Sequence, residues 1–211
     1  MTKKLTAREK ILAATENILA TEGLLAVNTN RIADEAKVNI STLYKNFSNK
    51  VDILAELLRN FEDARTEYIG SWAGLIESHD DWQRWADDIV RSMAEFRADR
   101  PAANQLRAAI KVHPELAEID ARSTQSAVDL MVAHLPPPID DDARDSLTSI
   151  LELASQTISM VLDDVPADTD EGHQRISALV AFISASYEAI SNLVVPAATS
   201  AGPRDLSLIH I

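Results

Sequence analysis

Residues 28–47 read NTNRIADEAKVNISTLYKNF, and this stretch contains the clearest structural signal in the sequence. The apolar positions in its first half share the spacing of one helix face and are Ile32, Ala33 and Ala36. Asn28 precedes them as a suitable N-cap, and Asn39 can cap a second short helix that ends at Phe47. Only residues 37–39 separate the two helices. The stretch therefore predicts a tight helix–turn–helix unit.

A unit of this length can place its second helix in the major groove of DNA. The second helix and its flanks carry amide, hydroxyl and ammonium groups, which suit contacts with phosphates and base edges. The residues that we expect to contact DNA are Asn28, Asn39, Ile40, Ser41, Thr42, Tyr44, Lys45, Asn46 and Lys50. Spacing alone leaves open that the two helices form a purely structural corner.

The charge distribution indicates two parts with different partners. The 211 residues carry a formal net charge of −13, which taken alone argues against a nucleic-acid partner. Residues 1–59 nevertheless carry a formal net charge of +2, whereas residues 60–211 carry a formal net charge of −15. Such asymmetry favours one part that can face a polyanion and one that cannot, although random drift of surface charge is the alternative.

The rest of the chain predicts helices and no strands. Prolines and glycines fall between stretches whose apolar residues recur every three or four positions, as they do at helix boundaries. The clearest break is residues 136–138, three prolines, after which Asp140 to Asp142 favour a helix N-terminus. The further expected helices cover residues 11–22, 49–76, 82–96, 143–164 and 170–195.

The last two expected helices have the most regular pattern. Their apolar residues step by four and three, and they are Leu147, Leu151, Ala154, Ile158 and Val161, then Ile176, Val180, Ile183, Tyr187, Ile190 and Val194. This is the seam of helices that pack at a shallow angle. Each helix has a second apolar face as well, so we expect a homodimer through this pair. An internal pair that packs within one subunit is the alternative.

Several protein classes lack support in the sequence. Cysteine is absent, and the five glycines leave no G-x-G-x-x-G motif and no P-loop. The five histidines lack the spacing of metal ligands, and neither G-x-S-x-G nor S-x-x-K is present. No apolar run approaches the roughly 20 residues of a membrane span. We therefore expect a cytoplasmic protein that is not an enzyme and uses no metal or cofactor.

Residues 8–58 resemble the N-terminal domain of TetR-type transcriptional repressors. That family shows a helix that ends at a Gly, followed by the pattern I-A-x-x-A-G-V-S-x-x-T-L-Y-x-x-F-x-x-K-x-x-L. The positions that carry the resemblance are Gly23, Ile32, Ala33, Ala36, Val38, Thr42, Leu43, Tyr44, Phe47, Lys50 and Ile53. Residues 113–118, HPELAE, resemble C-terminal domains of the same family more weakly.

The resemblance implies a homodimeric, all-helical DNA-binding regulator, a repressor that a small-molecule effector releases from a palindromic operator. It implies a helix–turn–helix DNA-binding domain over residues 1–48 and a helical ligand-binding and dimerisation domain over residues 49–195. Residues 196–211 are expected to form a tail. The alternative is a DNA-binding dimer with no small-molecule effector.

Two positions depart from the family pattern. Lys37 occupies the turn position where the family has Gly, and a left-handed conformation costs a non-glycine residue about 1–2 kcal/mol. We therefore expect a slightly different turn or tolerated strain. Thr29 stands where an apolar residue is usual, with Asn28 at the usual Thr/Ser cap.

The resemblance places the ligand pocket among the middle helices. The expected walls are Tyr68, Trp72, Trp85, Met93, Phe96, Met131 and Met160. The polar residues that could orient a ligand are Arg97, Asn104, Arg107, Gln125 and Gln156. Plain core packing is the alternative for the walls, and simple surface exposure is the alternative for the polar set. The surplus of acidic residues would suit a cationic ligand, but a solvated acidic surface explains it equally well.

Overall fold

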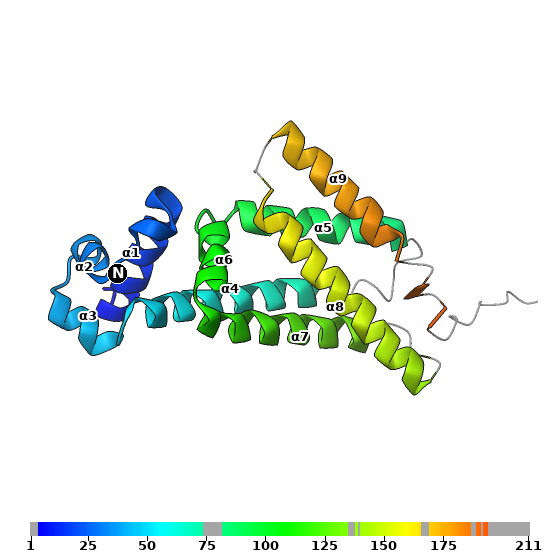
Figure 1. Cartoon of the computed structure of the whole chain (residues 1–211), viewed down its shortest axis with the longest axis horizontal. Helices are drawn as coiled ribbons and strands as arrows, with labels where there is room; N and C mark the ends of the chain where they lie inside the picture. Colours follow the sequence, from blue (N-terminus) through cyan, green and yellow to red (C-terminus); the bar gives the residue numbers. More distant parts are fainter. Residues whose placement is uncertain are drawn as a thin grey trace, which may run out of the picture.

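The computed structural model describes residues 4–73, 82–134, 138, 140–165, 169–186, 189–190 and 192–193, and every regular element in them is a helix. The fold is all-α, as the sequence predicts. Figure 1 shows a small N-terminal bundle and a larger C-terminal bundle, joined by the long helix α4 (Lys50–Ala73). Each helix in these ranges is too short or too polar to cross a membrane.

The first helix, α1 (Ala7–Glu22), begins with a reciprocal cap. The Thr6 hydroxyl accepts from the Glu9 amide (3.2 Å), and the Glu9 carboxylate accepts from the Thr6 amide (2.7 Å). This cap explains why the helix starts before residue 11, where the apolar pattern begins. The helix ends before Gly23, whose φ of 81° favours glycine.

The two short helices that residues 28–47 predict are present. The N-terminal bundle is completed by η1 (Leu24–Ala26), α2 (Thr29–Ala36) and α3 (Ile40–Asn46). The largest side chains of its core are fully buried and are Ile11, Ile18, Leu19, Val27, Ile32 and Leu43. This burial holds the two short helices against α1 in one orientation.

The C-terminal bundle contains α5 (Trp82–Ala98), α6 (Ala103–Val112), η3 (Pro114–Leu116), α7 (Ala117–His134), α8 (Asp141–Asp163) and α9 (Asp170–Ser184). In Figure 1, α7 lies along α4, and α9 folds back beside α5. The short helix α6 contacts both bundles, because the Gln105 side-chain oxygen accepts from the Leu24 amide (3.0 Å). The two bundles are therefore joined at α4 and again at α6.

Two expectations for the last helices need correction. The helix expected over residues 170–195 is shorter in the structure, where α9 ends at Ser184, although residues 189–190 are again helical and the Ile190 amide donates to the Ser186 carbonyl (3.1 Å). Of the expected seam, Tyr187 and Val194 lie outside the described residues, as do residues 74–76 of the helix expected over 49–76. The seam packs inside the subunit, where Leu147 and Leu151 are buried.

The second apolar face of the α8–α9 pair remains exposed. Leu153 is 61% exposed, Met160 is 64% exposed and Phe182 is 59% exposed. We call this exposed face the outer apolar face.

Candidate nucleic-acid interface and ligand cavities

The turn between α2 and α3 closes without a glycine. Lys37 adopts φ 54° and ψ 43°, the left-handed conformation, and its amide donates to the carbonyls of Ala33 and Asp34. The next amide, of Val38, donates to the Ala33 carbonyl (3.1 Å). Of the two outcomes expected for Lys37, the structure shows tolerated strain, with the turn geometry that glycine would adopt.

The helix α3 presents most of the expected DNA-contacting residues. Ile40, Ser41, Tyr44 and Lys45 are exposed, while Thr42 is half-buried. They are displayed in this way because Leu43, on the opposite side of the same short helix, is fully buried in the bundle core. The result is a hydrogen-bonding and cationic surface on a rigidly held helix.

Three asparagines of the expected set have structural partners. The Asn28 side-chain oxygen accepts from the Arg31 amide (3.0 Å), and that of Asn39 accepts from the Thr42 amide (2.7 Å). The Asn46 side chain donates to the Thr42 carbonyl (2.8 Å). Asn28 and Asn39 therefore act as N-caps that fix α2 and α3.

Lys50 and Arg8 lie at the junction of α3 with its neighbours. Lys50 is the first residue of α4 and lies next to the end of α3. Its ammonium donates to the Val27 carbonyl (3.4 Å). Arg8, which sequence reasoning did not single out, pairs with Glu56, donates to the Asn46 carbonyl (3.1 Å) and lies 4.5 Å over the Phe47 ring. Arg8 thus ties α1, α3 and α4 together.

The C-terminal bundle contains a narrow inner cavity of about 50 Å³. Among the expected pocket residues, those that line it are Trp85, Met93, Phe96, Arg97 and Met131. The Tyr68 ring packs on the Phe96 ring, with 5.1 Å between the ring centroids. Trp72 is half-buried against the same core but lines none of the described cavities. Most of the wall is apolar, and the walls come from α4, α5, α7 and α8 with residues 183, 186 and 190.

Three expected pocket residues lie on the outside instead. Gln125, Gln156 and Met160 are exposed and line none of the described cavities. Ile158 and Ile183, which the seam places at the expected contact between subunits, line the inner cavity. Helical spacing gives the apolar face of a helix but not the neighbour that this face meets.

The polar end of the inner cavity consists of Arg65, Arg97, Ser155 and Ser159. The Arg65 guanidinium donates to the Ser123 hydroxyl (2.9 Å) and to the Ser159 hydroxyl (3.3 Å), and its Nε is 2.6 Å from the Glu62 carboxylate. Sequence reasoning missed Glu62 and Arg65. Two charges at i, i+3 on the buried face of α4 were the available signal.

Arg107 belongs to a buried ion network rather than to a cavity. Its guanidinium contacts the carboxylates of Glu62 (2.7 Å), Asp120 (2.8 Å) and Asp163 (2.7 Å). Burial by itself lowers the pKa of Arg107, but the three carboxylates outweigh it and raise this pKa above its ordinary value. Arg107 therefore stays charged and holds α4, α6, α7 and α8 together.

Arg97 lies between the ion network and both cavities. Burial lowers the pKa of its guanidinium, and nearby Arg107 lowers it further, while Asp163 at 2.5 Å opposes both effects. A carboxylate or other acceptor beside Arg97 would stabilise its charge. Arg97 is thus a buried cation with one close anionic partner and a second side open to cavities.

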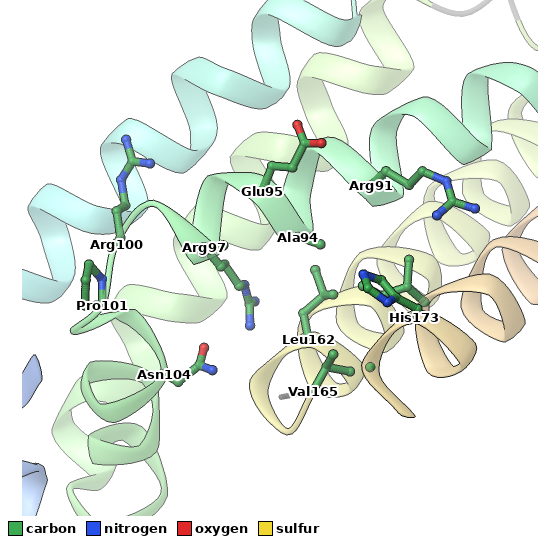
Figure 2. A pocket seen from close by; sticks show the side chains of 13 residues that line it. Arg91, Ala94, Glu95, Arg97, Arg100, Pro101, Asn104, Leu162, Val165 and His173 are labelled. Atoms are coloured by element: carbon green, nitrogen blue, oxygen red, sulfur yellow. The ribbon is translucent and has the colours of Figure 1, made fainter. Parts of the chain in front are cut away.

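A second, outer cavity of about 370 Å³ opens between the end of α5, the start of α6 and the α8–α9 hairpin (Figure 2). Figure 2 shows Arg97 and Asn104 directed toward its interior, with His173 across from them. Its polar lining residues are Arg91, Glu95, Arg97, Arg100, Asn104 and His173. Asn104 therefore lies at this outer cavity and not among the walls of the inner one.

Two family models match the chain and define its class. The model described as bacterial regulatory proteins, tetR family, matches residues 11–57. The model described as tetracyclin repressor-like, C-terminal domain, matches residues 80–183. These two matches, together with the exposed helix α3, define the protein as a helix–turn–helix DNA-binding transcriptional regulator. The chain belongs to the TetR family, whose members are transcription factors rather than enzymes.

Solved structures share the fold at low sequence identity. A TetR-family transcriptional regulator from Streptomyces coelicolor is 19% identical, with a TM-score of 0.64 over 88% of this chain and 99% of that one. The multidrug binding protein EbrR, complexed with imidazole, is 14% identical, with a TM-score of 0.65 over 92% and 99%. The fatty acid degradation regulator FadR from Bacillus halodurans is 20% identical, with a TM-score of 0.54 over 88% and 96%. No curated protein matches the chain.

Proposed function

We propose that this protein is a homodimeric repressor that leaves a palindromic operator when a small-molecule effector enters the inner cavity and widens it, because the cavity of about 50 Å³ holds only a few water molecules. The observation that carries the proposal is the path of α4. This helix begins at Lys50 beside α3 and supplies Arg65 and Ile69 to the cavity wall, so one rigid element reaches both regions (Figure 1).

A shift of α4 can change the distance between the two α3 helices of a dimer, which are the helices that would enter the major groove. Both helices must meet successive major grooves together, so a changed separation penalises both contacts at once. Linkage requires that DNA lower the effector affinity by the same factor as the effector lowers the DNA affinity, typically about 5- to 150-fold.

The cavity lining favours one class of effector. Arg65 and Arg97 are its charged residues, and no carboxylate lines it among the described residues. An apolar molecule with an acceptor or acidic group fits this lining better than the cation that the acidic composition left open. The fold likeness to EbrR, a multidrug binding protein complexed with imidazole, supports a small-molecule ligand in this architecture.

Operator affinity with and without a bound ligand tests the proposal. A thermal-shift screen finds the ligand, because a ligand at 100 times its dissociation constant stabilises the fold by about 2.7 kcal/mol. We expect that ligand to weaken operator binding. Ala154→Leu narrows the inner cavity and should abolish the response, whereas Ala133→Leu on the exposed face of α7 should not. A ligand that enters the inner cavity yet leaves operator affinity unchanged would instead favour a DNA-binding dimer without an effector.

A further inference from the structure

A contact between two hydroxyl groups joins the two short helices of the helix–turn–helix unit. The hydroxyl of Thr29, the first residue of α2, lies 3.3 Å from the hydroxyl of Tyr44 on α3. The two residues are 15 positions apart in the chain, so the contact depends on how α2 and α3 pack. Thr29 stands where the family pattern has an apolar residue, which could not form this hydrogen bond. The contact is therefore a feature of this chain rather than of the family pattern.

Tyr44 lies on the side of α3 that we expect to face DNA. It is 53% exposed, whereas the preceding residue, Leu43, is fully buried in the bundle core. An exposed side chain without a partner turns freely about its bonds, and ordering it on DNA costs binding free energy. Thr29 is half-buried in a helix that Asn28 caps, and its branched side chain has few rotamers. The contact with Thr29 therefore restricts where the Tyr44 hydroxyl lies before DNA binds.

The direction of the hydrogen bond can adapt to a phosphate. In the free protein either hydroxyl can be the donor. A phosphate oxygen only accepts, so Tyr44 must use its single O–H proton to bind one. The Tyr44 oxygen can then accept from the Thr29 hydroxyl, and hydrogen bonds in such a chain strengthen one another. Thr29 can therefore support a phosphate contact without touching DNA itself.

We propose that Thr29 is a positioning residue for DNA binding. Its hydroxyl donates to the Tyr44 hydroxyl and so directs the Tyr44 proton toward a phosphate of the operator. Sequence reasoning did not place Thr29 in the DNA interface, because its partner on α3 is set by the packing of the two helices. The inference rests on operator binding in the proposed function, but not on an effector or on either cavity.

Thr29→Val tests the proposal, because valine has nearly the shape of threonine and restores the apolar character of the family pattern. The probe is a fluorescein-labelled duplex that the wild-type protein selects from a pool of random sequences, and fluorescence anisotropy measures its affinity. We expect Thr29→Val to weaken binding about three- to tenfold, the range for the loss of one hydrogen bond. Thr29→Ser keeps the hydroxyl and should restore the wild-type affinity.

A double-mutant cycle with Tyr44→Phe separates positioning from a purely structural role. If Thr29 acts through the Tyr44 hydroxyl, Thr29→Val should not change DNA affinity in the Tyr44→Phe background. A general effect on α2, or a direct contact of Thr29 with DNA, would weaken binding equally in both backgrounds and would overturn the proposal. The dependence of affinity on salt concentration should match wild type in these variants, because none of them removes a charge.

A matched control and the wild-type protein complete the test. Thr21→Val removes an exposed threonine hydroxyl on α1 that donates to the Asn17 carbonyl (2.7 Å), and it should leave DNA affinity unchanged. A wild-type protein that selects no duplex would overturn operator binding itself. A wild-type protein that binds its duplex no more tightly than Thr29→Val does would overturn the role of Thr29 alone.

Discussion

Lys37 shows how one residue can keep a turn while it carries strain. In the described residues it is the non-glycine residue with a positive φ, and it stands where the family pattern has glycine. We expect Lys37→Gly to stabilise the fold by about 0.5–1 kcal/mol, because relief of the left-handed strain exceeds the added entropy of the unfolded chain. Lys37→Ala removes the same charge but keeps the strain. Equal urea midpoints for the two variants would contradict this account.

Lys45 and Lys50 are expected to play different parts in DNA binding. Together with Thr42 and Tyr44, Lys50 is assigned to phosphates, whereas exposed Lys45 is assigned to base edges with Ile40, Ser41 and Asn46. Lys50→Ala should weaken binding to all duplexes alike and lower the salt slope by about one. Lys45→Ala should change which operator is preferred, while Lys111→Ala, on an exposed part of α6, should do neither. Fluorescence anisotropy at several salt concentrations distinguishes these results.

At the scale of elements, the buried ion network decides how the C-terminal helices are held. Glu62 on α4 is 1% exposed and contacts both Arg65 and Arg107. Removal of one charge from such a network leaves its partners buried and uncompensated, so Glu62→Gln should destabilise the fold by about 3 kcal/mol or more. Glu67→Gln, at an exposed position of the same helix, should change stability by less than about 0.5 kcal/mol. Urea unfolding monitored by circular dichroism measures both.

Helix α6 is the second connection between the two bundles. The hydrogen bond from the Leu24 amide to Gln105 joins it to the residue that follows Gly23. Gln105→Ala should speed hydrogen exchange at the Leu24 amide roughly fivefold, which corresponds to the loss of one ordinary hydrogen bond. Gln125→Ala on α7 removes a similar side chain far from this contact and serves as the control. An unchanged exchange rate in Gln105→Ala would mean that the contact is not formed in solution.

At the scale of the whole molecule, the outer apolar face is the expected dimer contact. Leu153 and Phe182 lie exposed on neighbouring helices, so Phe182→Asp or Leu153→Asp should give monomers, because a charge would be buried without a partner. Val112→Asp, at a comparably exposed apolar residue on α6, should leave the dimer intact. Light scattering measures the oligomeric state directly, and a wild-type protein that is monomeric at micromolar concentration would refute the dimer.

Local signals in the sequence predict the first helix and the helix–turn–helix unit, whereas α6 and α7 are not predicted and the last helix is expected to run to residue 195. N-caps at Asn28 and Asn39, the stop at Gly23 and the apolar spacing of α2 are local signals, and each depends on residues a few positions apart. Because these signals are local, residues 28–47 alone are enough to predict which side of α3 is exposed and can face DNA.

The packing of the helices against one another sets which faces meet and where the cavities lie. Ile158 and Phe182 both lie on apolar faces of helices, and helical spacing does not show which of these faces is covered. In the structure Ile158 lines the inner cavity, whereas Phe182 is exposed. The ion network of Glu62 and Arg107 joins residues 45 positions apart, and the outer cavity joins α6 to α9. Such neighbours depend on how the helices pack, which periodicity within one helix does not encode.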